Sequence, residues 1–185
     1  PAIVVAQAGQ LSSAALEPIR VQLRWYHQFQ YAGYYAAKKK GFYEEAGFDV
    51  TLVAGSSELM PVKEVLAGRA QFGSSNSQIL LFRLQGEALV TLAAIFQHSP
   101  SVLITLASSG IKTPQDLIGR RVMSLGGHSD VSLIAMLRQE GIQLDEVELV
   151  GSSFQIQDLV DSKVDAFHGY LTNEPFELEK QGVLY

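Results

Sequence analysis

The chain has 185 residues, of which 47% are hydrophobic and 18% are charged, and its formal net charge is −5 at pH 7. This length and composition are typical of a globular protein with a sizeable core, either one large domain or two small ones. The absence of cysteine excludes disulfides, thiolate metal sites and cysteine nucleophiles. The acidic balance, with a single short basic run at 38–40, argues against nucleic acid as a partner.

The first 18 residues are expected to form a lead-in that stands apart from the folded lobes. Residues 1–8, PAIVVAQA, are similar to the tail of a secretory signal peptide, because an apolar patch is followed by the small-x-small pattern of a cleavage site. A small-residue linker or an N-terminal strand is the alternative. Residues 9–18 are polar and small. The longest nearly apolar stretch, at 88–96, is about half of what a membrane span needs.

After the lead-in, strand and helix patterns alternate. Pro61 and Gly68 punctuate one predicted helix at its start and near its end, and Ser77 caps the next one. In chain order we predict strand 21–25, helix 32–40, strand 48–54, helix 61–69, strand 70–76, helix 77–86 and a buried strand at 88–96. Repeated strand-helix units indicate a parallel sheet with helices on its faces.

The same alternation then begins again. Thr113 is the predicted cap of a helix with Pro114 in its first turn, and Ser129 is the predicted cap of a later helix that ends at Gly141. The order is strand 101–107, helix 113–120, strand 121–125, helix 129–141, strand 147–151, helix 153–163 and strand 164–171. We therefore predict an α/β protein with two lobes, 19–100 and 101–185, and a ligand cleft between them.

In open parallel sheets, ligands bind beyond the carboxyl ends of the strands. The segments that follow predicted strands are therefore candidates for the site: 25–30, 73–76, 96–99, 126–130 and 169–174. The first belongs to an unusual stretch, WYHQFQYAGYY at 25–35, in which six of eleven residues are aromatic. Rings interleaved with His27, Gln28 and Gln30 suit a flat ligand that is stacked and hydrogen-bonded at its edges. Packing of these rings in the core is the alternative.

The remaining chemistry-bearing residues point to binding. The four histidines, His27, His98, His128 and His168, lie at or near predicted strand ends but lack the local pairing of a metal site, so hydrogen-bonding or structural roles are expected. No nucleophile motif is present. Because Arg24 is placed inside the strand 21–25, no arginine is expected at a strand end to bind a carboxylate, which favours a heterocycle over an amino acid.

Several blocks resemble one family in the same order: 23–52, 67–81, 93–100, 113–122 and 170–176. They are similar to the periplasmic solute-binding family that recognises thiamine pyrimidine precursors and related heterocycles, and similar domains are fused to histidine kinases or diguanylate cyclases as sensors. The resemblance implies a type II periplasmic-binding fold in an extracytoplasmic location. It implies a small-molecule ligand such as a pyrimidine or flavin, and a membrane permease or fused signalling module as partner.

The chain also departs from this family. Pyrimidine synthases of the family carry a cysteine-rich motif and a cofactor-binding lysine after the strand that matches 70–73, whereas this chain has Ser74, Ser75 and Asn76 there. We therefore expect a binding protein without a cofactor, and a pyridoxal-phosphate-dependent synthase is the alternative. The chain ends at Tyr185, about where such folds return to the first lobe. A truncated first lobe with an uncovered apolar face favours a homodimer or a segment swap.

The expected ligand-binding residues come from both lobes. The rings of Trp25 and Tyr34 are expected to stack on or flank the ligand, and the residues of the second lobe to approach it on closure. In chain order the predicted set is Trp25, His27, Gln30, Tyr34, Ser75, Asn76, His98, His128, Ser129, Tyr170 and Glu174.

Overall fold

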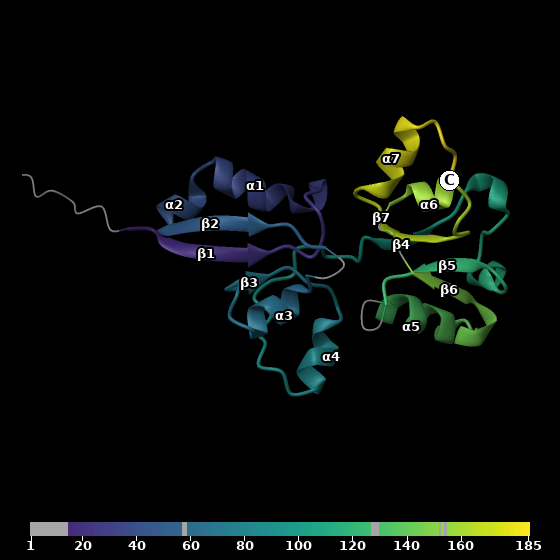
Figure 1. The fold of residues 1–185 in the computed structure, drawn as a ribbon, viewed down its shortest axis with the longest axis horizontal. Helices are drawn as coiled ribbons and strands as arrows, with labels where there is room; N and C mark the ends of the chain where they lie inside the picture. The colour runs from purple at the N-terminus through teal and green to yellow at the C-terminus, as the bar shows by residue number, and fades with distance from the viewer. Residues whose placement is uncertain (1–14, 57–58, 127–129, 152, 154) are drawn as a thin grey trace, which may run out of the picture.

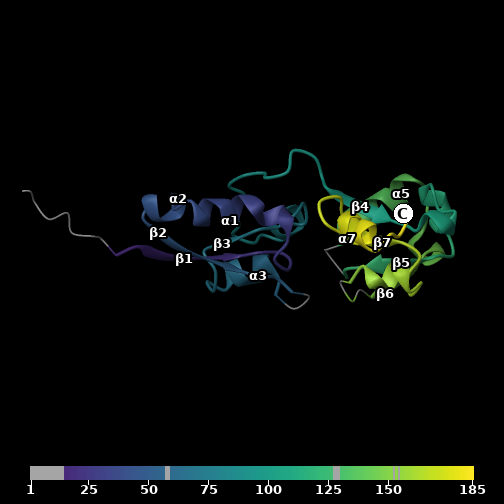
Figure 2. The ribbon, with the colours of Figure 1, turned by 90° about the horizontal axis from the view of Figure 1, so that it is seen from above.

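The computed structural model describes residues 15–56, 59–126, 130–151, 153 and 155–185. Its elements form two groups joined by the segment 87–100 (Figures 1 and 2). The first group holds β1 to β3 with α1 to α4, and the second holds β4 to β7 with α5 to α7. Among the described residues, no helix is long and apolar enough to cross a membrane. The proposed signal-peptide remnant, 1–8, lies outside the described residues.

The first half is built on a parallel sheet of order β2-β1-β3. Its strands are β1 (Glu17–Gln22), β2 (Phe48–Val53) and the short β3 (Phe72–Gly73). Its helices are η1 (Phe29–Tyr31), α1 (Ala32–Lys39), α2 (Phe42–Glu45), α3 (Pro61–Leu66) and α4 (Ile79–Leu84). Apolar residues that alternate along β1 and β2 form its main core with Leu23 and Tyr31.

The second half has two small sheets joined by a bridge between Val122 and Ala166. β4 (Ser101–Ile104) pairs antiparallel with β7 (Phe167–Tyr170), and β5 (Arg121–Ser124) pairs in parallel with β6 (Glu148–Gly151). The helices are η2 (Ala107–Ser109), η3 (Pro114–Leu117), α5 (Val131–Gln139), η5 (Leu144–Glu146), α6 (Gln157–Val160) and α7 (Glu174–Lys180). Two apolar clusters fill the space between these layers.

The α/β class is confirmed, and the start signals at Pro61 and Pro114 are confirmed as first-turn prolines. Several details differ from the prediction. β1 ends at Gln22, three residues before the predicted strand does, because its register with β2 is fixed from Glu17 to Gln22. β7 runs antiparallel to β4, and α7 follows β7 without having been predicted.

The predicted buried strand at 88–96 is wrong. The structure assigns no strand there, and residues 90–99 are exposed, with Val90 79% and Leu92 72% exposed. Leu89 alone is buried, in the cluster with Val62 and Phe82. A strand needs a neighbour for its backbone groups, and β3 pairs only with β1 among the described strands. The predicted homodimer or segment swap that would cover this surface stays a prediction.

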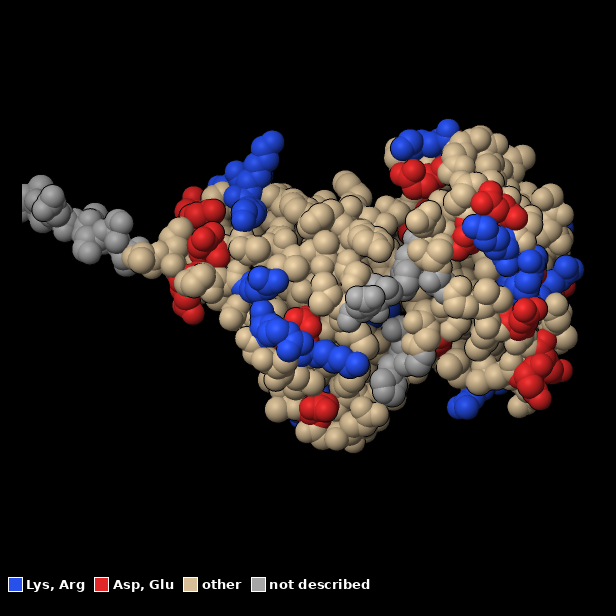
Figure 3. Space-filling view, viewed as in Figure 1, with Lys and Arg blue, Asp and Glu red and all other residues tan. Residues whose placement is uncertain are grey.

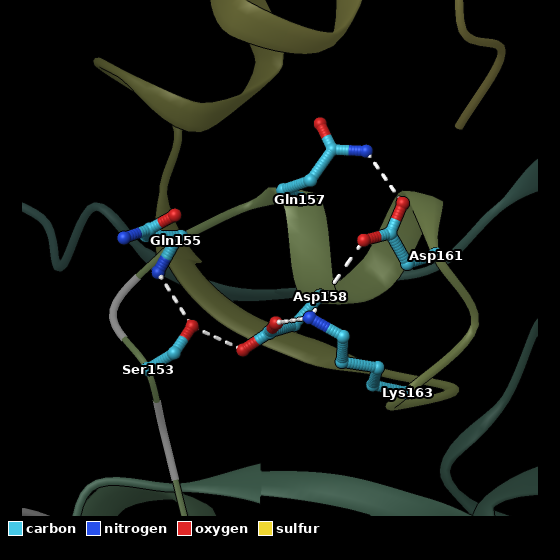
Figure 4. A network of polar contacts seen from close by, with 6 residues as sticks. All are labelled: Ser153, Gln155, Gln157, Asp158, Asp161 and Lys163. Atoms are coloured by element: carbon cyan, nitrogen blue, oxygen red, sulfur yellow. Dashed lines mark hydrogen bonds and ion pairs between the residues drawn. The ribbon is translucent and has the colours of Figure 1, made fainter.

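A polar network closes the turn of α6 in the second half (Figure 4). Asp158 accepts hydrogen bonds from the Ser153 hydroxyl and from Lys163, whose Nζ lies 2.9 Å from Oδ1. Lys163 also lies 3.7 Å from Asp161, which accepts a hydrogen bond from Gln157. The Ser153 hydroxyl, and then Lys163, lower the pKa of Asp158. Every charge of this network has its partner within the network.

Candidate ligand-binding cleft

One cavity lies between the two halves and takes its lining from both of them and from the segment between them. The first half contributes Arg24, Trp25, Gln28, Gln30, Tyr31, Tyr34, Ser74, Ser75 and Asn76. The segment 87–100 contributes Ile95 and Phe96, and the second half contributes Ser101, Leu125, His168, Gly169, Tyr170 and Glu174. Most of these residues directly follow a strand of the structure, or lie in one near its end, as expected for open α/β sheets.

The segment that follows β1 is held by main-chain hydrogen bonds on both sides. Arg24 N donates to Ser74 Oγ over 2.8 Å, and Gly55 N donates to Trp25 O over 2.8 Å. Gly55 has no room for a side chain, because a Cβ atom there would lie 2.4 Å from the Arg24 carbonyl carbon and 2.5 Å from the Leu23 oxygen. The direct contact of these two backbones fixes where Arg24 and Trp25 leave the sheet.

The aromatic stretch divides into three environments. Tyr31 is 5% exposed and belongs to the core of the first half, and burial raises the pKa of its phenol. Trp25 and Tyr34 are partly buried, pack against that core and line the cavity. Tyr26 and Phe29 are 49% and 77% exposed and lie outside the lining. Within this stretch, Tyr31 therefore belongs to the core and Trp25 and Tyr34 line the cavity, and the binding role of these two rings stays a prediction.

The polar residues after β3 are partly engaged in holding their own loop. Asn76 Oδ1 accepts a hydrogen bond from Gln78 N over 3.1 Å, and Ser75 Oγ lies 3.5 Å from the Gln78 amide nitrogen. The Ser74 hydroxyl accepts a hydrogen bond from Arg24 N and is also hydrogen-bonded with the Tyr31 phenol. The helix that follows has only six residues, so side chains rather than a helix N-terminus define this part of the lining.

β7 and the start of α7 supply the opposite wall. Glu174 is 8% exposed, and its carboxylate accepts hydrogen bonds from Tyr170 N over 2.6 Å and from the Asn173 amide over 3.0 Å. Gly169 makes room for it, because a Cβ atom there would lie 2.9 Å from Glu174 Oε2. The ring of Phe96 meets that of Tyr170 edge-on, with centroids 6.5 Å apart. This wall is ordered by its own contacts.

His168 lies in the middle of β7 with one nitrogen engaged. Its Nε2 is hydrogen-bonded with the Ser101 hydroxyl across the β4–β7 ladder, whereas Nδ1 is buried and has no partner among the described residues. Burial lowers the pKa of His168, Asp130 opposes this shift, and Arg24 adds to it. Burial therefore favours the neutral form of the imidazole.

Asp130 accepts the hydrogen bonds of the backbone N–H groups that follow β5. Its buried carboxylate accepts hydrogen bonds from the Ser124 hydroxyl over 2.6 Å, from Leu125 N over 2.7 Å and from Gly126 N over 2.8 Å. The N–H groups of this loop, which could bind an anion, are thus filled by the chain's own carboxylate.

Comparison with known proteins agrees with this architecture. The sequence profile described as "NMT1/THI5 like" matches residues 28–185. The chain belongs to the NMT1/THI5-like family. Its solved neighbours include a Bordetella bronchiseptica protein with a TM-score of 0.74 and 18% identity, covering 94% of this chain and 56% of that one. The alkanesulfonate-binding protein SsuA of Xanthomonas axonopodis, with a TM-score of 0.68 and 18% identity, covers 93% and 61%. The type II periplasmic-binding fold implied by the sequence is confirmed.

Curated relatives are similar at lower coverage of their own length. A Haemophilus influenzae protein named for thiamine biosynthesis is 29% identical over 92% of this chain and 54% of its own. The riboflavin-binding protein RibY of Chloroflexus aurantiacus is 27% identical over 91% and 50%, and the formylaminopyrimidine-binding protein of Halalkalibacterium halodurans is 25% identical over 90% and 51%. A Legionella pneumophila relative, 23% identical over 87% and 52%, is named a pyrimidine phosphate synthase. The chain spans about half the length of these relatives.

Seven of the eleven predicted ligand-binding residues line the cavity: Trp25, Gln30, Tyr34, Ser75, Asn76, Tyr170 and Glu174. His27 and His98 do not. His27 is exposed and is hydrogen-bonded with the Tyr35 hydroxyl, and His98 is exposed in the segment between the halves. His128 and Ser129 lie outside the described residues.

Two residues outside the predicted set change the chemistry of the site. Arg24 lies beyond β1 and lines the cavity, so its predicted position inside a strand is wrong. The preference for a heterocycle over an amino acid loses the support that it took from this position. His168 was recognised as a strand-end histidine but was not included. Both positions depend on where a strand ends, which the hydrophobic pattern at 21–25 and 164–171 does not define.

The charged surface around this cleft is uneven (Figure 3). On the face shown, lysine, arginine, aspartate and glutamate side chains gather toward the outer parts of both halves. Arg24 is the one lysine or arginine among the described residues that line the cavity.

Proposed function

We propose that this chain binds a small, partly aromatic heterocycle in the cleft between two lobes, 19–100 and 101–185, as an extracytoplasmic solute-binding protein or sensor domain. The observation that carries the proposal is the cavity itself, whose lining combines aromatic rings with amide, hydroxyl and imidazole groups from both halves. The names of two relatives support a ligand of this class, since one is named a riboflavin-binding protein and the other a formylaminopyrimidine-binding protein.

Trp25 and Tyr34 are proposed to stack on the ring, because both are partly buried against the core and face the cavity from one side. Gln30, Ser75 and Asn76 are proposed to bond its edges from the first lobe. Tyr170 is proposed to meet the ligand from the second lobe, and Glu174 to hold that wall through its hydrogen bond to Tyr170 N. His128 and Ser129 remain predicted contacts.

Binding without catalysis is favoured over a synthase. Lys63 is the sole lysine between residues 41 and 111 in the sequence, and it lies exposed on α3, outside the lining of the cavity. A lysine that forms a Schiff base with a cofactor has to face the substrate. We therefore propose that transport through a membrane permease, or a fused signalling module, uses the bound state.

Trp25 is the chain's single tryptophan, so its fluorescence reports on the cleft alone. Titration with riboflavin, pyrimidines and their formylamino derivatives should change this emission at saturating ligand. Trp25→Ala should weaken binding of the same ligand, measured by calorimetry, by about tenfold. Tyr34→Phe keeps the ring and should retain most of the affinity. Binding that is unchanged in Trp25→Ala contradicts the proposed site.

A further inference from the structure

Arg24 is half-buried and has no carboxylate partner among the described residues. Arg121, the other half-buried arginine in the described part of the chain, donates two hydrogen bonds to Asp165, from Nε over 3.1 Å and from Nη2 over 2.8 Å. Even Arg69, which is exposed, forms an ion pair with Glu64. No ion pair joins Arg24 to any described Asp or Glu. Its guanidinium, partly buried at the lining of the cavity, lacks an internal counter-ion.

The acidic groups near the cleft are engaged elsewhere. The two oxygens of Glu174 accept from Tyr170 N and the Asn173 amide, and Asp130 is surrounded by Ser124, Leu125 and Gly126. Neither carboxylate is paired with Arg24. A half-buried guanidinium that faces a mostly apolar cavity gains most from a planar anion, to which it can donate two parallel hydrogen bonds.

A second, independent observation lies on the opposite wall. His168 Nδ1 is buried without a hydrogen-bond partner, although buried polar atoms are nearly always paired. The imidazole lines the same cavity, and it is near enough to Arg24 for that charge to act on it. Two polar groups from different halves, one cationic and one lacking a partner, therefore converge on one space.

We propose that the ligand of this cleft carries an anionic group, a carboxylate, sulfonate or phosphate, that pairs with Arg24 and is approached by His168 from the second half. The proposal rests on ligand binding in this cleft and adds the charge class of the ligand. Arg24 and Trp25 both line the cavity from the loop after β1, so one ligand can present its ring to Trp25 and its anionic group to Arg24. The backbone of Arg24 is held between Ser74 and Gly55, which fixes where its side chain leaves the main chain.

Matched probe pairs that differ only in the charged group test the proposal. Flavin mononucleotide and riboflavin form one pair, and nicotinate and nicotinamide form another. The anionic member of a binding pair should bind at least about tenfold more tightly, as expected for charge-assisted hydrogen bonds. Arg24→Gln should abolish this preference while the neutral member keeps its affinity. His168→Asn should reduce the preference by a smaller factor.

Arg20→Gln is the control, because Arg20 lies exposed on β1, outside the lining of the cavity, and its loss changes the net charge equally. It should leave the preference unchanged. The salt dependence of wild-type binding gives a readout that needs no variant, since raising ionic strength should weaken the anionic member only. Equal affinity of both members, or a preference that survives in Arg24→Gln, overturns the anionic group and leaves the proposed cleft intact. Failure of both members of every pair to bind overturns the proposed function together with it.

Discussion

The loops that follow β5 and β1 differ in whether their charged groups have partners within the chain. After β5, the N–H groups of Leu125 and Gly126 surround the carboxylate of Asp130, so the loop is electrostatically complete. After β1, Arg24 is fixed through its backbone but its side chain has no such partner among the described residues. One loop carries its own anion, and the other leaves a cation open to the cavity.

This difference shows why a strand end alone does not identify a binding contact. Both loops lie at the carboxyl ends of strands and both contribute to the cavity lining. Only an unfilled hydrogen-bonding capacity separates a contact available to a ligand from one used for folding. The predictions below perturb one loop or the other.

The largest effect is expected from Gly55→Ala, because Gly55 packs directly against the loop that follows β1. Its Cβ atom would lie 2.4 to 2.5 Å from the backbone of Leu23 and Arg24, so that backbone must shift. We expect a loss of about 3 kcal/mol in the free energy of unfolding. The emission of Trp25 should move to longer wavelength. Denaturant unfolding followed by fluorescence measures both.

Gly33→Ala is the matched control for this substitution. Gly33 lies exposed inside α1, and a Cβ atom there meets nothing within 4 Å. Alanine should stabilise the helix by about 0.5–1 kcal/mol. If Gly55→Ala is as stable as Gly33→Ala, the close contact between Gly55 and the backbone of Arg24 does not contribute to folding.

Asp130→Ala removes the carboxylate that accepts the hydrogen bonds of the loop after β5. Three donors lose a buried charged acceptor, so we expect a loss of about 2–3 kcal/mol in the free energy of unfolding. Sulfate, added to the thermal melt, should restore part of the stability in this variant and little in the wild type. Asp145→Ala, at an exposed position of η5, should change stability by less than about 0.5 kcal/mol. Unchanged stability in Asp130→Ala would contradict the claim that the Asp130 carboxylate stabilises the loop after β5.

Arg121→Gln compares an arginine that is paired with a carboxylate with Arg24, which has no such partner among the described residues. The quantity compared is the pH dependence of the free energy of unfolding. Hydrogen bonds from Arg121 hold the pKa of Asp165 below its ordinary value of about 3.9. A depressed folded-state pKa adds stability above the ordinary value, and this contribution is lost as pH falls through the lowered pKa. The wild type should therefore exceed Arg121→Gln in stability at pH 7 but not at the acid end of the range. Arg24→Gln should show no such dependence, and urea melts from pH 7 to pH 2.5 compare them.

The smallest effect is expected in the network of Figure 4. Lys163 is largely exposed, and the Ser153 hydroxyl contributes more than Lys163 does to the lowered pKa of Asp158. Lys163→Gln should therefore leave the melting temperature nearly unchanged, whereas Ser153→Ala should raise the pKa of Asp158 more, as measured by NMR titration. The reverse order would show that the exposed ion pair dominates.

Much of the fold was predictable because local signals agree with it. The prolines at 61 and 114 begin helices, and alternating apolar residues form β1 and β2. The stretch at 88–96 failed because strand formation depends on a neighbouring strand, which no local pattern reveals. The antiparallel direction of β7 likewise depends on how the chain returns through the second half.

The candidate site was predictable to the level of segments and less so for single residues. Trp25 and Tyr34 could be chosen because rings near a strand end need a partner surface. His27 could not be separated from Gln30, because their directions depend on the turn before η1. Arg24 was missed because a shift of a few residues in a strand end moves a side chain from sheet to cleft.

The antiparallel ladder of β4 and β7 has a mechanical consequence. Between residues 15 and 185 the chain passes from one half to the other once, through 87–100, and β4 is the first strand that it enters. β7, which carries His168 to Tyr170, is hydrogen-bonded to β4 along its whole length, from Ser101↔Tyr170 to Ile104↔Phe167. We expect a displacement of β7 on ligand binding to be passed through these backbone hydrogen bonds to β4, and so to the segment that joins the two halves.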